Sequence, residues 1–591
     1  MVTNFGRCRA LWCIGLVTLL FWSGCGKPAS SQPKARPVAD ASRRQADNNG
    51  LGPTIGMLAE VFSSDYIQVR GYGLVGGLNG TGSSECPPQI RTYLEKYILQ
   101  HFTGTKVDVD ELISSPDTAV VVVDGVIPPA SSQNQRFDIR VAALSGTQTT
   151  SLEGGWLYGA DLYEARQFGM SIKPLATAEG SVYVDVLDPN TADLRVGYVL
   201  GGGKVGEDFK INLTLRRPDY RVASQIRNRI NERFGYETAW ALAPGSIELR
   251  VPTKYAGAKD RFIQLVKATY LAETPELTER RISFHIQRMA GAPNKNAHEI
   301  ALEAIGNACL PKLAALLNSS AADVRFLAAR CMLNLGDAAG RETLLNIAAD
   351  KTSPYRLEAI ETIAKATSKQ EAGSLLRGFL RDDDFAVRFA ACENLIRLND
   401  TSVSQKLIAD SFHLDEITES GRPAIFISRQ NQARVILLAA PIYCRGNVFV
   451  ETPDGAITIN VPAGQNSATI IRKHPRRPET ILHLQSSLDL ADVIQTLCKE
   501  PVARPNEGRP GLGVSYSTLV GLLKQMVDSG AVQAEFHAGP LPGYRPASPQ
   551  STGHPTVDAL RRMSPATGTQ SPAQSRDSQP DQRQDEPKIK K

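Results

Sequence analysis

Three glycines in the stretch Arg70–Gly82, RGYGLVGGLNGTG, have the spacing of a dinucleotide-binding loop. Gly71, Gly73 and Gly76 spell G-x-G-x-x-G, which serves a pyrophosphate when a strand precedes the glycines and a helix opens within them. The run DYIQVRGY suits a strand, but turn-forming residues follow Gly76 and a helical pattern starts only near Pro88. No GK[ST] follows either, so the sequence argues against a nucleotide site. The glycines instead allow positive φ angles and close neighbours.

Other residues with catalytic or ligand potential are dispersed along the chain. The eight histidines form no H-E-x-x-H motif, and no G-x-S-x-G or S-x-x-K stands in a supporting context. Asp108, Asp110 and Glu111 form D-V-D-E, but without further oxygen ligands nearby we interpret them as a solvated turn rather than a cation site. No C-x-x-C or Cys/His cluster occurs. We therefore predict no catalytic, cofactor-binding or metal-binding residue, and a protein that is not an enzyme.

One basic run stands out in a chain whose formal net charge is only +5 over 591 residues. Arg472, Lys473, Arg476 and Arg477 cluster in the run RKHPRR. Such a patch attracts an anionic partner, for example a cell-wall polymer or the phosphates of lipid A. A solvated loop is the alternative interpretation. The small net charge gives no nucleic-acid signature, so we expect no nucleic-acid partner.

The N-terminal segment, 1–24, reads as an export signal of the lipoprotein type. Arg7 and Arg9 precede the apolar run Leu11–Trp22, which is too short to span a bilayer. Small residues then precede Cys25, so Cys25 is the predicted first residue of the mature chain and the predicted site of lipidation. An ordinary cleaved signal followed by an incidental cysteine is the alternative. The residues after Cys25 are not acidic, which favours the outer membrane.

Composition and periodicity divide the chain into six segments. Two polar stretches have too little apolar surface to form a core, and three blocks with strand or helix periodicity lie between them. The predicted segments are 1–24 signal peptide, 25–50 flexible linker, 51–292 N-terminal α+β region, 293–403 helical repeats, 404–539 C-terminal β-rich region and 540–591 disordered tail.

The two mixed blocks contain strands and amphipathic helices. TAVVVVDGVIPP, FDIRVAAL and DFKINLTL read as strands of the first block, and AIFISR, ARVILLAA, NVFVET and AITINV as strands of the second. Helical spacing places Val222, Ala223, Ile226 and Ile230 on one face of a helix in the first block. In the second block, Ser517 is the expected N-cap of a helix and Gly530 its expected C-terminal residue with positive φ.

The block 293–403 repeats itself. Similar helical units start at Val324, Tyr355 and Val387, so the interval between successive units is nearly constant. Such units bury their apolar faces only by stacking, which is typical of an α-solenoid of HEAT-like repeats. Arg325, Arg356 and Arg388 recur at one phase, and we interpret them as structural residues, with a partner-binding face as the alternative.

Seven cysteines remain once a signal that ends at Gly24 is removed. Cys309, Cys331 and Cys392 lie on the repeat helices, where buried packing is the expected role. Cys444 and Cys498 either form a disulfide in an oxidising compartment or remain free buried thiols. Their spacing does not decide between these alternatives.

The glycine-rich stretch resembles the N-terminal signature of bacterial flagellar P-ring proteins, VGYGLVVGLNGTGD. Further segments resemble that family in the family's own order: DTAVVVVDGVIPP, FDIRVAALSGTQTTSLEGGWLYGADLY, INLTLRRPDYRVASQIRNRINERFG and, after the repeats, TLVGLLKQMVDSGAVQAEF. The resemblance covers most of 53–290 and, less closely, 405–537. The residues that carry the signature are Gly71, Tyr72, Gly73, Gly76, Gly77, Asn79, Gly80 and Gly82.

The resemblance implies an α+β multidomain protein that forms a homo-oligomeric ring in the periplasm. Such a ring surrounds the flagellar rod as a bushing, at the peptidoglycan layer and beside the L-ring. The HEAT-like repeats, the polar tail and the lipid on Cys25 depart from the family pattern. The alternative is a lipid-anchored periplasmic adaptor that reuses the P-ring fold and binds a protein through the repeats.

Overall fold

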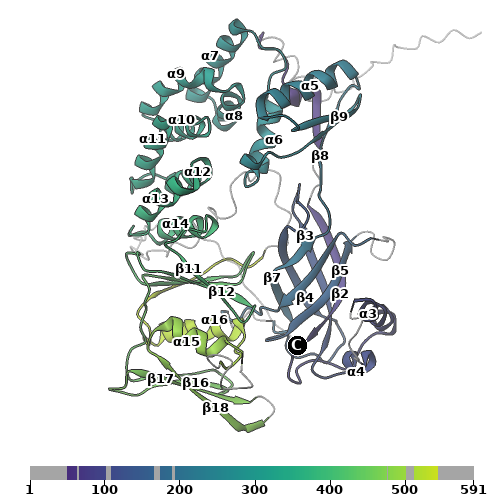
Figure 1. The fold of residues 1–591 in the computed structure, drawn as a ribbon, viewed down its shortest axis with the longest axis vertical. Helices are drawn as coiled ribbons and strands as arrows, with labels where there is room; N and C mark the ends of the chain where they lie inside the picture. Colours follow the sequence, from purple (N-terminus) through teal and green to yellow (C-terminus); the bar gives the residue numbers. More distant parts are fainter. Residues whose placement is uncertain are drawn as a thin grey trace, which may run out of the picture. The chain divides into compact units, whose positions relative to one another are not determined.

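The computed structural model describes residues 50–62, 66–101, 108–165, 173–188, 193–474, 477–500 and 511–542 (Figure 1). Cys25, Arg476, the predicted signal peptide, almost all of the linker and the tail beyond residue 542 lie outside these residues. Residues 1–50 and 51–591 are separate units, and the elements below belong to the second. They combine helices with sheets, which confirms the prediction of a mixed α and β protein.

Six antiparallel strands close into a barrel (Figure 1). The run of valines in β3 explains its place, because β-branched residues favour strands and Val121 and Val123 are fully buried inside. In barrel order the strands are β2 Ile67–Gly76, β3 Ala119–Ile127, β4 Arg136–Ala143, β7 Val196–Val205, β6 Ala176–Ser181 and β5 Trp156–Glu164, after which β5 pairs with β2.

Two helices cover part of the barrel wall. α3 (Pro88–His101) buries Leu94, Tyr97 and Ile98, and Leu94 and Ile98 share a hydrophobic cluster with residues of β2 and β3. α4 (Val109–Ile113) starts after Asp108, whose carboxylate accepts hydrogen bonds from two backbone amides of the first turn. The D-V-D-E motif is therefore a helix cap.

A second layer pairs an antiparallel sheet with helices. Its strand order is β1-β8-β10-β9, with β1 Ala59–Phe62, β8 Ile211–Leu215, β10 Ser246–Leu249 and β9 Ala239–Ala243. Of the predicted apolar face of α5 (Tyr220–Phe234), Ala223, Ile226 and Ile230 are buried and Val222 is half-buried. The other elements of this layer are α2 Ile55–Leu58, the 3₁₀ helix η2 Thr253–Tyr255 and α6 Lys259–Ala268.

Successive helices fill the chain from residue 275 to residue 397 (Figure 1). Apolar side chains from all of the longer helices share one hydrophobic cluster, so these helices bury one another. In chain order they are α7 Pro275–Gly291, α8 Lys295–Ile305, η3 Asn307–Cys309, α9 Leu310–Ala314, η4 Ala315–Asn318, α10 Ala322–Asn334, α11 Ala338–Ala349, α12 Arg356–Ala366, α13 Lys369–Phe379 and α14 Phe385–Arg397. The three predicted repeat units correspond to α10, α12 and α14.

Two sheets with two helices between them make up the C-terminal region (Figure 1). The five-stranded sheet has the order β11-β12-β14-β13-β19, with parallel pairs β12–β14 and β13–β19, and the four-stranded sheet β15-β16-β17-β18 is antiparallel. The bounds are β11 Ser404–Ile408, β12 Phe412–Ile417, β13 Ala424–Ser428, β14 Arg434–Leu438, β15 Val448–Glu451, β16 Ile457–Val461, β17 Ser467–His474, β18 Arg477–Ser487, α15 Leu490–Cys498, α16 Tyr516–Asp528 and β19 Glu535–Ala538.

The start of α16 corrects one prediction. Ser515, not Ser517, is the N-cap, since its side chain accepts a hydrogen bond from the Thr518 amide. Ser517 lies inside the first turn and is fully buried, so the actual cap lies two positions before the predicted one. Gly530 has the expected positive φ of 72° beyond the end of the helix.

Candidate functional site: the barrel seam and the contacts between parts

The signature residues lie where β2 meets β5 and the barrel closes. Gly71, Tyr72, Gly73 and Gly76 belong to β2, and the remaining signature residues, Gly77, Asn79, Gly80 and Gly82, follow in the loop before α3. The pairing of β2 with β5 shifts register between Arg70 and Val75. The signature thus occupies the irregular seam of the barrel.

Close backbone approach explains two of these glycines. A Cβ on Gly71 would lie 2.2 Å from the carbonyl oxygen of Asp161 in β5, and a Cβ on Gly82 would lie 2.1 Å from the carbonyl oxygen of Thr118. Real Cβ atoms do not come that near to backbone oxygens, so any side chain there would force the strands apart. The loop after β2 is also tied down, because the Gly82 amide donates to Pro116 O at 2.9 Å and the Ser83 amide to Thr118 O at 2.8 Å.

The geometry gives the glycines a structural role. Tyr158 of β5 covers Gly76, where an added Cβ would lie 2.5 Å from the ring. The next helix along the chain, α3, begins only at Pro88, so the glycine loop does not open a helix as a dinucleotide-binding loop does. These observations fit the sequence-based interpretation that the loop is not a nucleotide site.

The residues of the basic run differ in their surroundings. The Arg472 guanidinium turns inward and donates to the carbonyl oxygen of Leu512, and burial lowers its pKa. Lys473 is exposed on β17. Arg476 and the side chain of Arg477 lie outside the described residues. The anionic-partner patch stays a prediction, with Arg472 engaged inside the protein.

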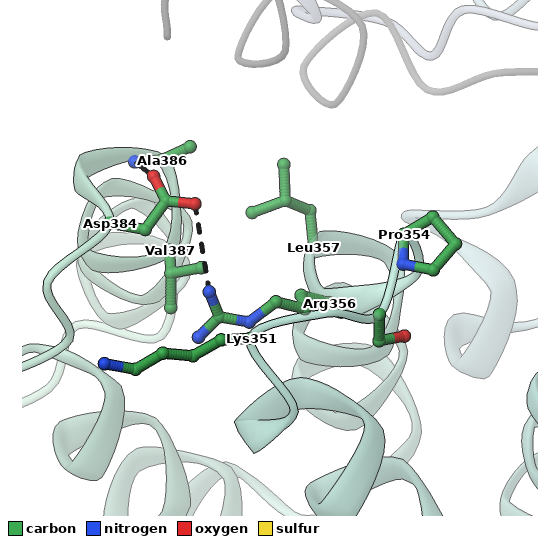
Figure 2. A pocket seen from close by; sticks show the side chains of 8 residues that line it. Lys351, Pro354, Arg356, Leu357, Asp384, Ala386 and Val387 are labelled. Atoms are coloured by element: carbon green, nitrogen blue, oxygen red, sulfur yellow. Dashed lines mark hydrogen bonds and ion pairs between the residues drawn. The ribbon is translucent and has the colours of Figure 1, made fainter. Parts of the chain in front are cut away.

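A pocket of about 200 Å³ lies between the turn before α12 and the start of α14. Figure 2 shows Arg356 pointing across it toward Asp384, and the distance from Arg356 Nη1 to Asp384 Oδ2 is 3.8 Å. Arg356 also pairs with Asp382, and Lys351 pairs with Asp383 at 2.6 Å. Because these cations already face aspartates, we assign the pocket a structural role rather than an anion site.

The repeated arginines hold the turns that precede their helices. Arg325 donates from one nitrogen to the carbonyl oxygens of Ser319 and Ser320, in the turn just before its helix. Arg388 makes the equivalent pair of bonds to the carbonyls of Asp382 and Asp383. Two repeat units thus use the same arginine geometry, which supports the structural interpretation over a partner-binding face.

A buried charge cluster joins α6 to the helices that follow, and the sequence analysis did not identify it. The fully buried Glu299 of α8 forms ion pairs with Arg261 of α6 at 2.5 Å and with Arg330 of α10 at 2.9 Å. Burial alone would raise the pKa of Glu299, but the two guanidinium groups outweigh it and lower the pKa. Arg261 also pairs with Glu303. The signal was present in sequence only as scattered charges on amphipathic helices.

Two histidines form a second unexpected contact, between α7 and α8. His285 Nδ1 lies 3.0 Å from His298 Nδ1, and His285 Nε2 lies 2.9 Å from the Tyr270 hydroxyl. Burial, followed by the neighbouring His298 and Arg281, lowers the pKa of His285 to about 3. Burial and Arg288 lower the pKa of His298 as well. This pair therefore holds together as neutral imidazoles.

Polar contacts attach the barrel to the C-terminal region. The Val184 amide donates to Ser517 Oγ at 2.9 Å, and Arg429 pairs with Asp185 at 2.9 Å. Asp138 of β4 accepts from the backbone amides of Gly201 at 2.8 Å and Asn431 at 2.9 Å. These contacts join segments from distant parts of the sequence, which no local pattern could have revealed.

The six cysteines within the described residues are free thiols. Cys444 and Cys498 are both buried in the C-terminal core, and burial raises the pKa of Cys444 to about 11. Of the two alternatives for Cys444 and Cys498, the structure has the free buried thiols. Cys309, Cys331 and Cys392 are fully buried on the helices, as expected.

The described residues contain no group of three or more His, Cys, Asp or Glu side chains arranged to hold a metal ion. No single helix among them has the length and apolarity needed to cross a membrane, whereas the bent pair Lys295–Ile305 with Asn307–Asn318 meets the criterion by length and composition. That pair is bent by 116°.

The fold and its contacts define a multidomain protein whose distinctive residues close a barrel and join its parts. Sequence comparison shows what this part of the chain is similar to: the model of the flagellar P-ring protein family matches residues 55–280. This range contains the complete barrel and the sheet layer beside it. Residues 55–280 are thus similar to flagellar P-ring proteins.

Several curated relatives are flagellar P-ring proteins. The flagellar P-ring protein of Thermotoga maritima is 34% identical over 214 residues, which cover 34% of this chain and 61% of the relative. That of Pseudothermotoga lettingae is 30% identical over 214 residues with the same coverage. That of Helicobacter pylori is 26% identical over 233 residues, covering 37% of this chain and 61% of the relative. The chain thus spans about three fifths of the length of these relatives.

Proposed function

We propose that this chain is a structural, non-enzymatic component of the bacterial flagellar basal body, where it forms a P-ring around the rod. The observation that carries the proposal is the family match over residues 55–280, which takes in the glycine seam. The matched part contains the closed barrel, in which every strand pairs with two neighbours. Such a unit suits a bushing, whose work is mechanical.

Ring formation follows from one kind of contact repeated. A head-to-tail contact between two different patches of identical subunits closes into a ring when its rotation divides a full turn. The expected surroundings are the periplasm, the peptidoglycan layer, the rod and the L-ring. A lipid on Cys25 would fasten each subunit to a membrane, with the outer membrane favoured by the residues after Cys25.

We further propose that residues 293–403 are a HEAT-like α-solenoid inserted between two P-ring-like parts, 51–292 and 404–539. Three observations support this proposal: the nearly constant spacing of the helical units, the shared arginine geometry of α10 and α14, and the single hydrophobic cluster across the helices. The inserted helices would offer a surface for an additional partner of the ring.

The test is electron microscopy of purified basal bodies from cells that carry a tagged version of this chain. We expect label in a periplasmic ring, lost motility in the deletion strain and restored motility when the tagged chain is returned. The untagged chain in the same deletion strain is the control for effects of the tag. Label scattered over the envelope, with intact rings and motility in the deletion strain, would overturn the proposal and favour the lipid-anchored adaptor.

A further inference from the structure

Exposed arginines and large apolar side chains meet at one end of the sheet β1-β8-β10-β9. Tyr220 is 74% exposed and Leu242 is 63% exposed. They share this end because the Asp219 amide, just before α5, donates to Pro244 O in the β9–β10 turn at 2.9 Å. We call the exposed group the cationic tip; it consists of Arg217, Tyr220, Arg221 and Leu242.

The cationic tip keeps its positive charge. Among the described residues, Arg217 and Arg221 make no ion pair, whereas the adjacent Arg216 pairs with Glu60 at 2.7 Å. The nearby carboxylate of Asp219 is committed to the helix cap, since it accepts from the Arg221 amide at 2.7 Å and the Val222 amide at 3.2 Å. Two guanidinium groups are therefore free to meet an anion.

The fold itself does not require these side chains. The core face of α5 consists of Ala223, Ile226 and Ile230, which lie beyond Tyr220 along the helix. A single exposed apolar residue would be ordinary. A tyrosine and a leucine beside two unpaired arginines on a turn have instead the composition of a membrane-interface contact, in which arginines meet phosphates and the aromatic ring lies at headgroup level.

The chain from the N-terminus arrives at this same end. The Arg216 amide donates to Leu58 O at 2.9 Å, and Ala59 pairs with Leu215, so the backbone passes beside the cationic tip soon after Gly50. Residues 26–49 separate Gly50 from Cys25, a connection that extends to at most roughly 80 Å. A lipid on Cys25 would thus restrict the cationic tip to the neighbourhood of a membrane and raise its local concentration there.

We propose that the cationic tip binds the anionic phospholipid headgroups of the membrane that holds the lipid of Cys25. This inference rests on the lipid anchorage in the proposed function. Guanidinium groups bind phosphate oxygens in pairs of hydrogen bonds, and each arginine near such a surface strengthens binding about fivefold at low salt. Salt screens this part of the attraction.

The experiment is co-sedimentation of the purified chain without its predicted signal, residues 25–591, with vesicles. Two vesicle types are compared, phosphatidylethanolamine with one quarter phosphatidylglycerol, and phosphatidylcholine alone. The chain carries Cys25→Ser throughout, so that no lipid masks the contribution of the tip. We expect binding to the anionic vesicles only, weakened by added NaCl, and a loss of at least tenfold in R217Q/R221Q and in Y220S/L242S.

A matched control lies at the other end of α5. Tyr236 is 88% exposed and Arg250 is also exposed, so Y236S/R250Q removes the same side-chain types and should leave vesicle binding unchanged. All these side chains are exposed, so circular dichroism should report an intact fold. Equal binding by the tip variants and the parent chain, or no binding to anionic vesicles, would overturn the inference. Labelled rings in basal bodies alongside such a result would leave the P-ring function standing.

Discussion

At the scale of single residues, contact distance decides what each signature glycine does. Gly71 and Gly82 face main-chain carbonyls, which cannot move aside as a flexible side chain can. Gly77 and Gly80 instead have φ angles of 78° and 95°, where residues with a side chain are strained. The sequence predicted both kinds of role for the segment, but it could not assign them, because the opposing strand β5 lies far along the chain.

The seam predicts a strong effect of the smallest substitution. Gly71→Ala places a methyl group against Asp161 O and should lower the free energy of unfolding by about 3 kcal/mol, as overpacking in a well-packed core does. Urea unfolding of the full chain measures the loss. Gly257→Ala is the control, since nothing lies within 4 Å of its added Cβ. Equal midpoints for the two variants would contradict the assigned role of the seam.

The histidine pair predicts a dependence of stability on pH. His285 is a base whose folded pKa of about 3 lies below its ordinary value of 6.5, so the unfolded chain binds the extra proton first. The contribution of this contact to the free energy of unfolding is fully present above pH 6.5 and decreases as the pH falls toward 3. The decrease is about 1.4 kcal/mol per pH unit for each additional proton that the unfolded chain binds. Both imidazoles would otherwise be charged beside Arg281 and Arg288.

The measurement is urea unfolding at pH 7.5, 6.0 and 5.0. The double variant H285Q/H298Q should lose the part of the pH dependence that the pair provides, while carboxylates elsewhere affect both chains equally. Identical pH profiles for the parent chain and the variant would show that these imidazoles do not titrate differently on unfolding.

At the scale of elements, two serines two positions apart at the start of α16 have different tasks. Ser515 caps the helix, whereas Ser517 accepts a hydrogen bond from Val184 of the barrel segment. Sequence reasoning found the helix, its apolar face and its end at Gly530, because these follow from local periodicity and backbone preference. It placed the cap at Ser517 because both serines suit a cap, and only the tertiary contact distinguishes them.

This division of tasks is testable with matched variants. Ser515→Ala removes a cap and should cost about 1 kcal/mol. Ser517→Ala leaves the buried Val184 amide without its acceptor and should cost about 1–3 kcal/mol. Hydrogen exchange distinguishes the two, since the Val184 amide should exchange faster in S517A only. Faster exchange at Val184 in both variants, or in neither, would contradict the assignment.

The attachment of α14 predicts a large effect of one buried arginine. The side chain of Arg388 is fully buried, holds the carbonyls of the preceding turn and pairs with Glu535 of β19 at 3.1 Å. Arg388→Met keeps the bulk but leaves the turn's carbonyl acceptors unpaired, so stability should fall by about 1–3 kcal/mol. Thermal unfolding of R388M against the exposed-site control R381M checks this, and similar melting temperatures would contradict it.

At the scale of the whole molecule, the sequence predicted the helices and strands better than the contacts between distant segments. Strand runs, helix faces and the repeat spacing are local, and the elements follow them closely. The charge cluster at Glu299 and the contacts of Asp138, Asp185 and Ser517 depend on segments that only the folded chain brings together. Arg472 of the predicted basic patch likewise donates to Leu512 O, a contact with a segment that comes 40 positions later in the chain.

A double-mutant cycle tests the joint between the barrel and the C-terminal region. Arg429 and Asp185 are both mostly buried and lie 2.9 Å apart, so R429Q and D185N should show a coupling energy of about 1 kcal/mol or more in urea unfolding. The exposed pair Lys173 and Glu207, changed to K173Q and E207Q, should couple by less than about 0.5 kcal/mol. A coupling near zero for the buried pair would show that this joint does not hold the two parts together.

The helices between residues 275 and 397 are fastened at both ends. Arg261 forms an ion pair with Glu299 near the first of these helices, and Arg388 forms one with Glu535 near the last. Arg429 and Asp185 link the barrel to the C-terminal region directly. A twist of the barrel side relative to the C-terminal region is therefore resisted by two connections. One is the direct contact of Arg429 with Asp185, and the other is the series of helices. In the ring proposed above, the helices would brace each subunit and share the torque that a turning rod exerts.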